Sequence, residues 1–244
     1  MAEDYGRPRL SVVDCGVLDF DVALDLQQRL VEAKLAGAPG DYLLLTEHPP
    51  VVTLGRSADA RDDAEAERLA ARGVRVHRVS RGGRATYHGP GQIVGYPIVT
   101  LRGEHRDLHG YLLRLQSALV AGLRAHGIPA LTRSGHTGVW LCGKKVGSIG
   151  VCVRSWTTYH GFSLNVTAES LPPTELNPCG MAPDEFGCLS ELGFAAPRKA
   201  LGASIAEALA EDLGLRSLTA TLQDTLTNAP ESGMMASPTT IGGR

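Results

Sequence analysis

The chain is poor in aromatic residues, which make up 5% of its 244 positions, and it lacks any long uninterrupted apolar run. A membrane-spanning helix needs about 20 predominantly apolar residues, so the sequence predicts none. A formal net charge of −2 provides no overall attraction to nucleic acid or to anionic membranes. The first ten residues show no basic segment followed by an apolar one, as a secretory signal would. We therefore expect a soluble, cytoplasmic protein with no nucleic-acid or membrane partner.

Cysteine is also sparse, and its spacing excludes two kinds of site. The five cysteines are odd in number and show no C-x-x-C pair, so we expect neither a disulfide framework nor a structural zinc site. Cys142 and Cys152 stand in apolar runs and are predicted to be buried. Cys179 stands in a Pro-Cys-Gly turn, where a neighbouring cation would make it a thiolate nucleophile. An exposed but unreactive cysteine is the alternative. The histidine spacing indicates no metal.

Short apolar runs separated by glycine turns indicate the fold class. Helical spacing of apolar residues predicts helices over residues 21–38, 64–72, 107–126 and 199–213. Strands are predicted over residues 10–15, 41–46, 51–54, 74–79, 93–101, 130–133, 138–142, 146–154 and 158–166. The prediction is an α/β (α+β) protein with a mixed, largely antiparallel sheet and packed helices. Residues 1–222 are expected to form a single catalytic domain, and the Thr-, Ser- and Pro-rich residues 223–244 a disordered tail.

The segment over residues 81–92, RGGRATYHGPGQ, contains four glycines. Glycine lets a ligand approach the main chain closely, and Arg81, Tyr87 and His88 add polar and ring contacts. A small-molecule cradle is therefore one interpretation, and a tight turn between strands is the other. Arginines recur at every third position from 72 to 84. They would raise the local positive potential, which would suit an acidic or phosphate-bearing carrier of the substrate.

Lys145 stands in the sequence GKKVGSIGV, next to a near match to a phosphate-binding loop. The match fails because Lys145 replaces the hydroxyl residue that would hold magnesium, and because the residues before Gly143 are strand-like. Lysines are usually solvated surface residues. A partly desolvated lysine among these glycines would instead have a lowered pKa and could move a proton.

Taken together, several motifs resemble those of the lipoyl(octanoyl) transferases, the octanoyl-[acyl-carrier-protein]:protein N-octanoyltransferases. The motifs are HPPVVTLGR, RGGRATYHGPGQ with GYPI after it, GKKVGSIGV, YHGFSLNV and NPCG, in the family's order and approximate spacing over residues 10–213. This resemblance implies the single-domain α/β fold that the family shares with biotin and lipoate protein ligases.

The resemblance also implies roles for particular residues. Cys179 matches the family's acyl-thioester nucleophile, and Lys145 matches the lysine that activates it. Backbone N–H groups around Gly150 or at the 179–180 turn are candidates for stabilising the oxyanion. The residues that match the substrate pocket are Arg81, Gly82, Gly83, Arg84, Ala85, Thr86, Tyr87, His88, Ser148, Ile149, Gly150, Gly161, Phe162 and Ser163.

The implied reaction needs neither metal nor cofactor. An octanoyl group arrives on the phosphopantetheine of acyl carrier protein and passes through a cysteine thioester to a lysine of a lipoyl domain. The acceptors would be the lipoyl domains of 2-oxoacid dehydrogenases and the glycine cleavage H protein. Two alternatives stay open: an ATP-dependent lipoate–protein ligase on the same fold, and an acyl-binding module without turnover.

Overall fold

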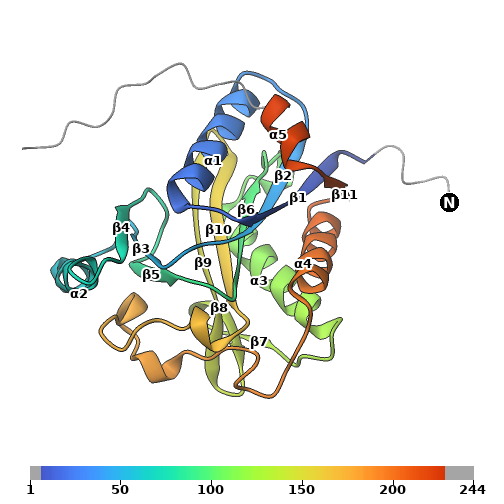
Figure 1. Cartoon of the computed structure of the whole chain (residues 1–244). Helices are drawn as coiled ribbons and strands as arrows, with labels where there is room; N and C mark the ends of the chain where they lie inside the picture. The colour runs from blue at the N-terminus through green and yellow to red at the C-terminus, as the bar shows by residue number, and fades with distance from the viewer. Residues whose placement is uncertain (1–6, 229–244) are drawn as a thin grey trace, which may run out of the picture.

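A large mixed sheet runs through the computed structural model, which describes residues 7–228 (Figure 1). Its strands, in spatial order, are β11 (Arg216–Ala220), β1 (Arg9–Val17), β2 (Asp41–Glu47), β6 (Gln92–Ile98), β10 (Thr157–Asn165), β9 (Lys144–Arg154), β8 (His136–Leu141) and β7 (Leu131–Arg133). Strand β1 pairs in parallel with β11 and β2, and every later pair in this order is antiparallel. The predicted mixed, largely antiparallel sheet is confirmed.

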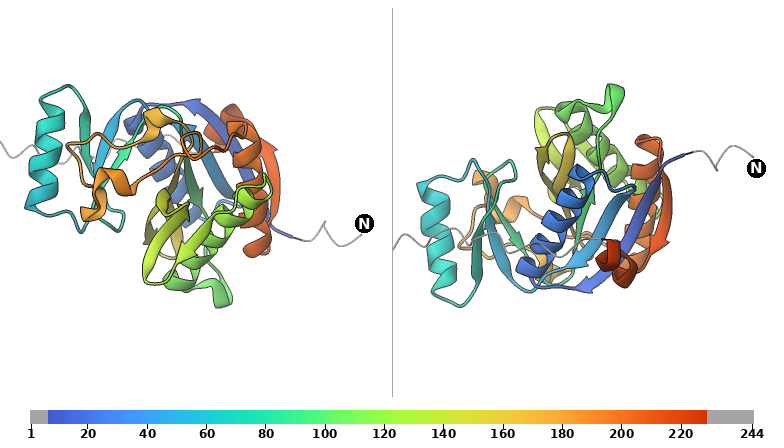
Figure 2. Two further views of the ribbon diagram at one scale, coloured as in Figure 1. Left: turned by 90° about the horizontal axis from the view of Figure 1, so that it is seen from below. Right: turned by 90° about the horizontal axis from the view of Figure 1, so that it is seen from above.

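Helices cover both faces of this sheet (Figure 2). Helices α1 (Phe20–Leu35) and α5 (Leu222–Asn228) pack on one face, and α3 (Leu108–Arg124) and α4 (Arg198–Asp212) on the other. Successive strand residues point to opposite faces, so Leu43 and Leu45 of β2 join the core with α3 and α4, while Leu44 joins the core with α1. Each buried leucine stabilises the fold by roughly 1.5–3 kcal/mol. The two faces explain why β2 reads as a continuous apolar run.

A second, smaller sheet stands beside the first, and with its helix we call it the small sheet unit. Its strands are β4 (Arg75–Arg78), β3 (Val51–Leu54) and β5 (Ala85–His88), and helix α2 (Ala60–Ala70) covers them. Its core is small and includes Val52, Leu54, Leu69 and Ala85. Helix α2 begins at a reciprocal capping box between Asp59 and Asp62. The unit projects from one edge of the molecule (Figure 1).

The residues between β10 and α4, 166–197, form a connecting segment that spans the two sheets. Its short 3₁₀ turns are η3 (Ala168–Ser170), η4 (Pro178–Gly180) and η5 (Pro183–Glu185); η2 (Gly103–His105) precedes α3. Leu176 of this segment is buried in the core of the small sheet unit. Further on, the backbone N–H of Gly187 donates to the Lys145 carbonyl on β9 at 3.1 Å. The connecting segment therefore brings η4 between the two sheets.

The structure corrects the sequence prediction in four places. Strands β5 and β11 were not predicted, and α2 begins at Ala60 rather than at residue 64 because the capping box fixes its start. The predicted disordered tail from Gln223 is wrong over its first residues, since α5 extends to Asn228. Leu226 packs onto the α1 core and Thr225 is buried, so a single apolar face sufficed to dock this turn. The rest of the predicted tail, residues 229–244, lies outside the described residues.

Candidate active site

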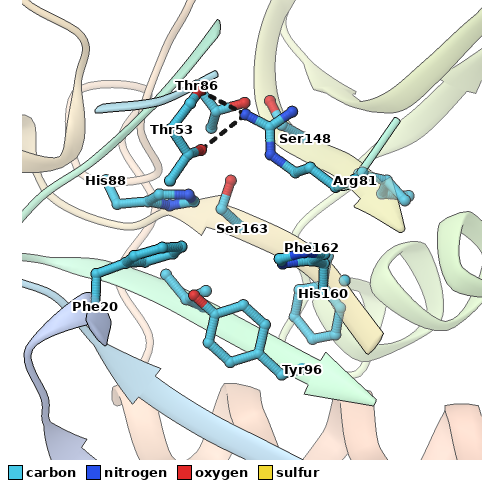
Figure 3. Close-up of a pocket in the computed structure, with 14 residues that line it drawn as sticks. Phe20, Thr53, Arg81, Thr86, His88, Tyr96, Ser148, His160, Phe162 and Ser163 are labelled. Atoms are coloured by element: carbon cyan, nitrogen blue, oxygen red, sulfur yellow. Dashed lines mark hydrogen bonds between the residues drawn. The ribbon is translucent and has the colours of Figure 1, made fainter. Parts of the chain in front are cut away.

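A pocket opens where the small sheet unit meets strands β6, β9 and β10. The pocket is lined by Phe20, Thr53, Arg81, Thr86, His88, Val94, Tyr96, Ser148, Ile149, Gly150, His160, Gly161, Phe162 and Ser163. Figure 3 shows Phe20 and Tyr96 at one end, and Arg81, Thr86 and Ser148 at the other. One end is therefore aromatic and the other polar, as a site for an apolar chain with a polar head requires.

Glycines on β9 and β10 create the room for this pocket. Gly150 pairs directly with Gly161 across the two strands. A Cβ atom at Gly150 would lie 3.0 Å from the carbonyl oxygen of Gly82, and one at Gly161 would lie 2.1 Å from that of Gly95. Any side chain at these positions would displace the backbone beside it. The motif glycines therefore let the Gly-rich loop rest on β9, where the Gly82 N–H donates to the Val151 carbonyl at 2.9 Å.

Nine of the predicted substrate-binding residues line the pocket, and five do not. Those outside its lining are Gly82, Gly83, Arg84, Ala85 and Tyr87. Ala85 is buried in the core of the small sheet unit, whereas Arg84 contacts carboxylates at the start of α2. Tyr87 lines an adjoining hollow, together with Thr86, Ser148, Ser163, Pro178 and Phe186 among others. The five belong to the walls that hold the loop or to this second hollow.

Sequence reasoning missed five of the lining residues: Phe20, Thr53, Val94, Tyr96 and His160. His160 stands in the motif YHGFSLNV but was not among the predicted pocket residues, and it is 2% exposed. Phe20 is the first residue of α1 and is edge-on to His48 at 5.6 Å between ring centroids. Tyr96 is held by its hydroxyl, which lies 2.7 Å from Nε2 of His48. Thr53, Tyr96 and His160 belong to the family motifs without having been predicted as site residues, whereas Phe20 lies outside the motifs and reaches the pocket as the first residue of α1.

The pocket histidines are neutral at physiological pH. Burial lowers the pKa of His88 to about 3, helped by the neighbouring His48, and burial likewise lowers that of His160 to about 3. Nδ1 of His88 lies 2.7 Å from Oε1 of Gln92, and the Gln92 amide donates to the Asn165 side chain at 2.9 Å. These contacts fix the rings in one orientation. The histidines contribute shape and hydrogen bonds to the pocket rather than charge.

Arg81 is a buried cation that donates hydrogen bonds to neutral oxygens. Its Nη2 donates to the carbonyl and hydroxyl oxygens of Thr53, both at 2.7 Å, and its Nη1 to the Gly82 carbonyl at 3.0 Å. Burial lowers its pKa to about 10, which leaves the guanidinium protonated at neutral pH. Arg81 therefore ties the Gly-rich loop to β3 and places a positive charge at the polar end of the pocket.

Lys145 lies near the start of β9 and is only 6% exposed. Its Nζ sits 5.6 Å from the centroid of the Trp140 ring, and its chain passes Gly138, where a Cβ atom would come within 2.8 Å of the Lys145 Cε. Burial lowers the pKa of Lys145, while the nearby Cys179 opposes this shift. A lysine in such surroundings gives up its proton more readily than a solvated one, which suits acid–base chemistry.

Cys179 lies in turn η4 and is exposed. Its backbone adopts φ 57° and ψ 23°, a left-handed conformation that costs a non-glycine residue of order 1 kcal/mol. Its Sγ is 3.9 Å from the Ala85 carbonyl oxygen, so the thiol lies beside the first residue of β5. The neighbouring Pro178 and Phe186 line the second hollow, and Phe186 forms a β-bridge with Lys145. The fold thus brings the predicted nucleophile and the predicted base to the same place.

Other sequence expectations have mixed outcomes. Cys152 is buried as predicted, but Cys142 is exposed because it stands at the β8–β9 turn with φ 49°. The near match to a phosphate loop is this β-hairpin.

Among residues 7–228 no group of three or more His, Cys, Asp or Glu side chains is arranged to hold a metal, and no helix there is long and apolar enough to cross a membrane. Arg72, Arg75, Arg78 and Arg84 each pair with a carboxylate, so they form no free basic stripe.

Similarities to known proteins agree with this geometry. The model of the lipoyl protein ligase A/B catalytic domain matches residues 19–210. An octanoyltransferase of Geotalea uraniireducens is 43% identical over 173 residues, which is 71% of this chain and 78% of that protein.

Solved structures give the fold. A bi-partite lipoate protein ligase from Thermoplasma acidophilum matches with a TM-score of 0.68 at 14% identity, covering 91% of both chains. A biotin protein ligase from Aquifex aeolicus matches with a TM-score of 0.53 at 16% identity, covering 84% of this chain and 70% of that one. The predicted likeness to biotin and lipoate protein ligases is confirmed. With its catalytic-domain match and its octanoyltransferase relatives, the chain belongs to the octanoyltransferases, a family of acyltransferases.

Proposed function

We propose that the protein moves an octanoyl group from acyl carrier protein to a lysine of a lipoyl domain through a thioester on Cys179. The observation that supports this proposal is the position of Cys179 and Lys145: Phe186 bridges to Lys145 and, with Pro178 beside Cys179, lines the hollow that adjoins a pocket with an aromatic end and a polar end. The aromatic end, with Phe20 and Tyr96, suits the apolar tail of an acyl chain. Lipoyl-domain acceptors are proposed because one structural neighbour is a lipoate protein ligase described with its E2 lipoyl domain.

In the first step, the Cys179 thiolate attacks the carbonyl carbon of the carrier-bound thioester. The bond from that carbon to the pantetheine sulfur breaks as the new bond to Sγ forms, and the pantetheine thiol leaves. Lys145 accepts the Cys179 proton before attack and returns a proton to the departing sulfur. One thioester replaces another, so the step is close to thermoneutral. The proposal therefore requires neither ATP nor metal nor another cofactor.

In the second step, the neutral ε-amine of the acceptor lysine attacks the acyl-enzyme carbonyl. Lys145 takes up the proton released from that amine and delivers it to the Cys179 sulfur, so that an amide and a free thiol result. The lowered pKa of Lys145 favours this role, because the side chain must alternate between its charged and neutral forms. The same lysine thus serves both half-reactions.

The oxyanion formed in each step needs hydrogen-bond donors. In the 179–180 turn, the Gly180 N–H already donates to the Asn177 carbonyl at 2.9 Å, which leaves the Cys179 N–H as the candidate there. The segment around Gly150, which lines the pocket, is the other candidate.

Two alternative functions, an ATP-dependent ligase and an acyl-binding module, would require different chemistry. An ATP-dependent ligase forms an acyl-adenylate and has no need of a cysteine nucleophile, and a binding module needs neither Cys179 nor Lys145. The ligase fold alone does not separate these functions, because ligases and transferases share it. The octanoyltransferase relatives support the transferase. A cytoplasmic location stays a prediction.

The test is to incubate the purified protein with octanoyl-loaded carrier protein, without ATP, and to measure the intact mass. We expect the protein to gain one octanoyl group, located on Cys179 by peptide mapping, and to pass it to an added lipoyl domain. The Cys179→Ala variant should gain nothing and should transfer nothing, while Cys142→Ser, which changes the other exposed thiol, should behave like the parent. Full transfer by Cys179→Ala would overturn the proposal.

A further inference from the structure

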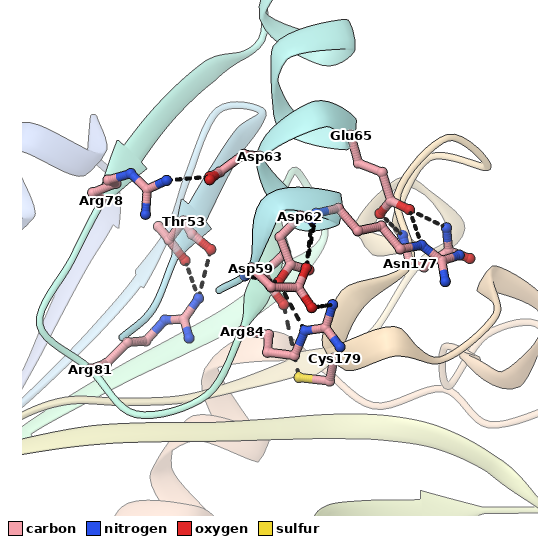
Figure 4. A network of polar contacts seen from close by, with 12 residues as sticks. Thr53, Asp59, Asp62, Asp63, Glu65, Arg78, Arg81, Arg84, Asn177 and Cys179 are labelled. Carbon is pink, nitrogen blue, oxygen red and sulfur yellow. Dashed lines mark hydrogen bonds and ion pairs between the residues drawn. The ribbon is translucent and has the colours of Figure 1, made fainter. Parts of the chain in front are cut away.

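Arg84 was predicted to line the substrate pocket, but it lies beside the nucleophile instead. Its Nε donates to Oδ2 of Asp62 at 2.8 Å, and its Nη2 lies 2.7 Å from Oδ2 of Asp59. Its remaining terminal nitrogen, Nη1, rests against the cysteine turn: a Cβ atom at Gly180 would be 3.2 Å from it. In Figure 4 the guanidinium stands between the two carboxylates and Cys179.

We propose that Arg84 is a positioning residue that keeps a positive charge against the Cys179 turn and thereby favours the thiolate of Cys179. Asp59 and Asp62 fix the guanidinium in place, as the capping residues at the start of α2. The proposal rests on the proposed function only in taking Cys179 as the reactive thiol.

Three cations interact with Cys179: Lys145 of β9, and Arg81 and Arg84 of the Gly-rich loop. Asp59 and Asp62, at the start of α2, pair with Arg84 on the side away from the cysteine. The pKa of Arg84 is raised, chiefly by its hydrogen bond to Asp62 and in smaller part by Cys179, which indicates mutual interaction between the guanidinium and the thiol. A nearby cation favours a thiolate, and a nearby carboxylate disfavours it.

Removing the guanidinium should disfavour the Cys179 thiolate whether or not the carboxylates neutralise the charge of Arg84. Without it, no cation stands between those carboxylates and the thiol. A second contact keeps the turn in place when Arg84 is changed. Glu65 of α2 accepts hydrogen bonds from the backbone N–H and the side-chain amide of Asn177, at 2.8 and 2.7 Å. The charge of Arg84 can therefore be altered while the turn stays anchored.

The experiment measures alkylation of Cys179 by iodoacetamide from pH 5 to pH 10 in a Cys142→Ser background, where Cys179 is the remaining exposed cysteine of the described residues. We expect Arg84→Gln to slow alkylation about threefold to tenfold at neutral pH, by moving the pH of half-maximal rate upward, with the same limiting rate at high pH. Arg84→Lys keeps the cation and should recover part of the rate.

Two further variants separate charge from structure. Arg78→Gln is the matched control, because Arg78 also pairs with α2, through Asp63, but is exposed and does not contact the cysteine turn; it should leave the pH profile unchanged. Asp59→Asn removes a negative charge and should keep or raise the neutral-pH rate. A purely structural role for the Asp59–Arg84 contact predicts slower alkylation in both Arg84→Gln and Asp59→Asn.

The proposal is overturned if Arg84→Gln leaves the pH profile where it was, or slows alkylation equally at every pH. It is also overturned if Arg78→Gln shifts the profile by the same amount. The reaction uses no octanoyl substrate, so its outcome is independent of the mass experiment that tests octanoyl transfer.

Discussion

The two residues proposed to do the chemistry are held in opposite ways. Lys145 lies in a regular strand of the large sheet, where burial and the Trp140 ring fix it. Cys179 lies in a short turn of the connecting segment, exposed, in a left-handed conformation, and anchored by polar contacts to the small sheet unit. One side of the site depends on apolar packing and the other on charged side chains of a single short helix.

The difference teaches that the two residues depend on different interactions. Loss of packing in the large sheet, away from Lys145, should mainly alter the free energy of unfolding, whereas loss of the polar contacts of α2 should also slow acyl transfer. In the proposed mechanism, two large partners must reach Cys179 in turn, so Cys179 cannot be buried as Lys145 is. The polar contacts of α2 give the exposed turn a fixed shape without covering it.

Lys145→Met should have the largest effect, because it removes the proposed base while keeping the apolar packing of the side chain. We expect acyl transfer to fall about 10²- to 10⁴-fold, because one proton acceptor serves both steps. The free energy of unfolding should stay equal or rise, since a buried charge is replaced by an apolar chain of similar shape. Turnover of octanoyl-carrier protein and urea denaturation measure the two effects. Lys144→Met is the control, and unchanged turnover in Lys145→Met would contradict the assigned role.

Lys34→Met should show the reverse, with lost stability and retained activity. Nζ of Lys34 lies 2.5 Å from Oδ1 of Asp41, and both side chains are almost completely buried. Removing the lysine leaves a buried carboxylate short of a partner, so the free energy of unfolding should fall by about 3 kcal/mol. The matched control is Arg154→Met, which breaks an exposed pair with Glu32 of the same helix and should cost at most about 1 kcal/mol. Urea denaturation would refute the interpretation if both losses were equal.

The pocket histidines make stability depend on pH. The pKa of His88 is about 3 in the folded protein, against about 6.5 for an unfolded chain. Between these values the unfolded state binds a proton that the folded state does not, so stability is complete above about pH 6.5 and falls as the pH drops toward 3. His88→Asn should flatten the slope by up to about 1.4 kcal/mol per pH unit. The substitution His109→Gln, at an exposed histidine, is the control for the loss of a ring; an unaltered slope in His88→Asn would contradict a lowered pKa of His88 in the folded protein.

The smallest effect is expected for Glu65→Ala, which tests whether α2 anchors the cysteine turn. Glu65→Ala removes both contacts to Asn177, so the cysteine turn loses an anchor. We expect about a tenfold slower transfer and a loss of about 1 kcal/mol in the free energy of unfolding. Glu65→Gln retains an acceptor oxygen and should recover part of the rate. Glu67→Ala, exposed on the same helix, is the control; equal rates for Glu65→Ala and Glu67→Ala would remove α2 from the account of the turn.

Much of the fold follows from apolar periodicity, and the failures have physical causes. The three long helices and most strands carry their spacing in the sequence. Strand β11 was missed because it is only partly buried at the sheet edge, and β5 because glycines precede and follow it closely. Had β5 been recognised, period-two alternation would have placed Thr86 and His88 in the pocket and Ala85 in the other core.

Site residues that match sequence motifs could be predicted, whereas those placed in the pocket by packing between distant elements could not. Gly150 and Gly161 could be named because they match the family's motifs, and the close backbone approach at both positions explains why glycine stands there. Phe20 and Tyr96 look like ordinary core residues, and only the docking of α1 on β6 brings them to the pocket. The capping box at Asp59 was readable in principle, but its second use, as a holder for Arg84, depends on contacts far apart in the sequence.

The backbone of Cys179 has a practical consequence for anyone who prepares an inactive form of the protein. At φ 57° a glycine is free of the steric conflict that a side chain suffers. Cys179→Gly would therefore relax the turn as well as remove the sulfur, so the variant would present a different surface to the proposed partners. Cys179→Ser keeps a side chain of similar shape and keeps the left-handed backbone conformation. It is the better variant for capturing the proposed partner proteins, because it should lose the reaction while keeping the shape of the turn.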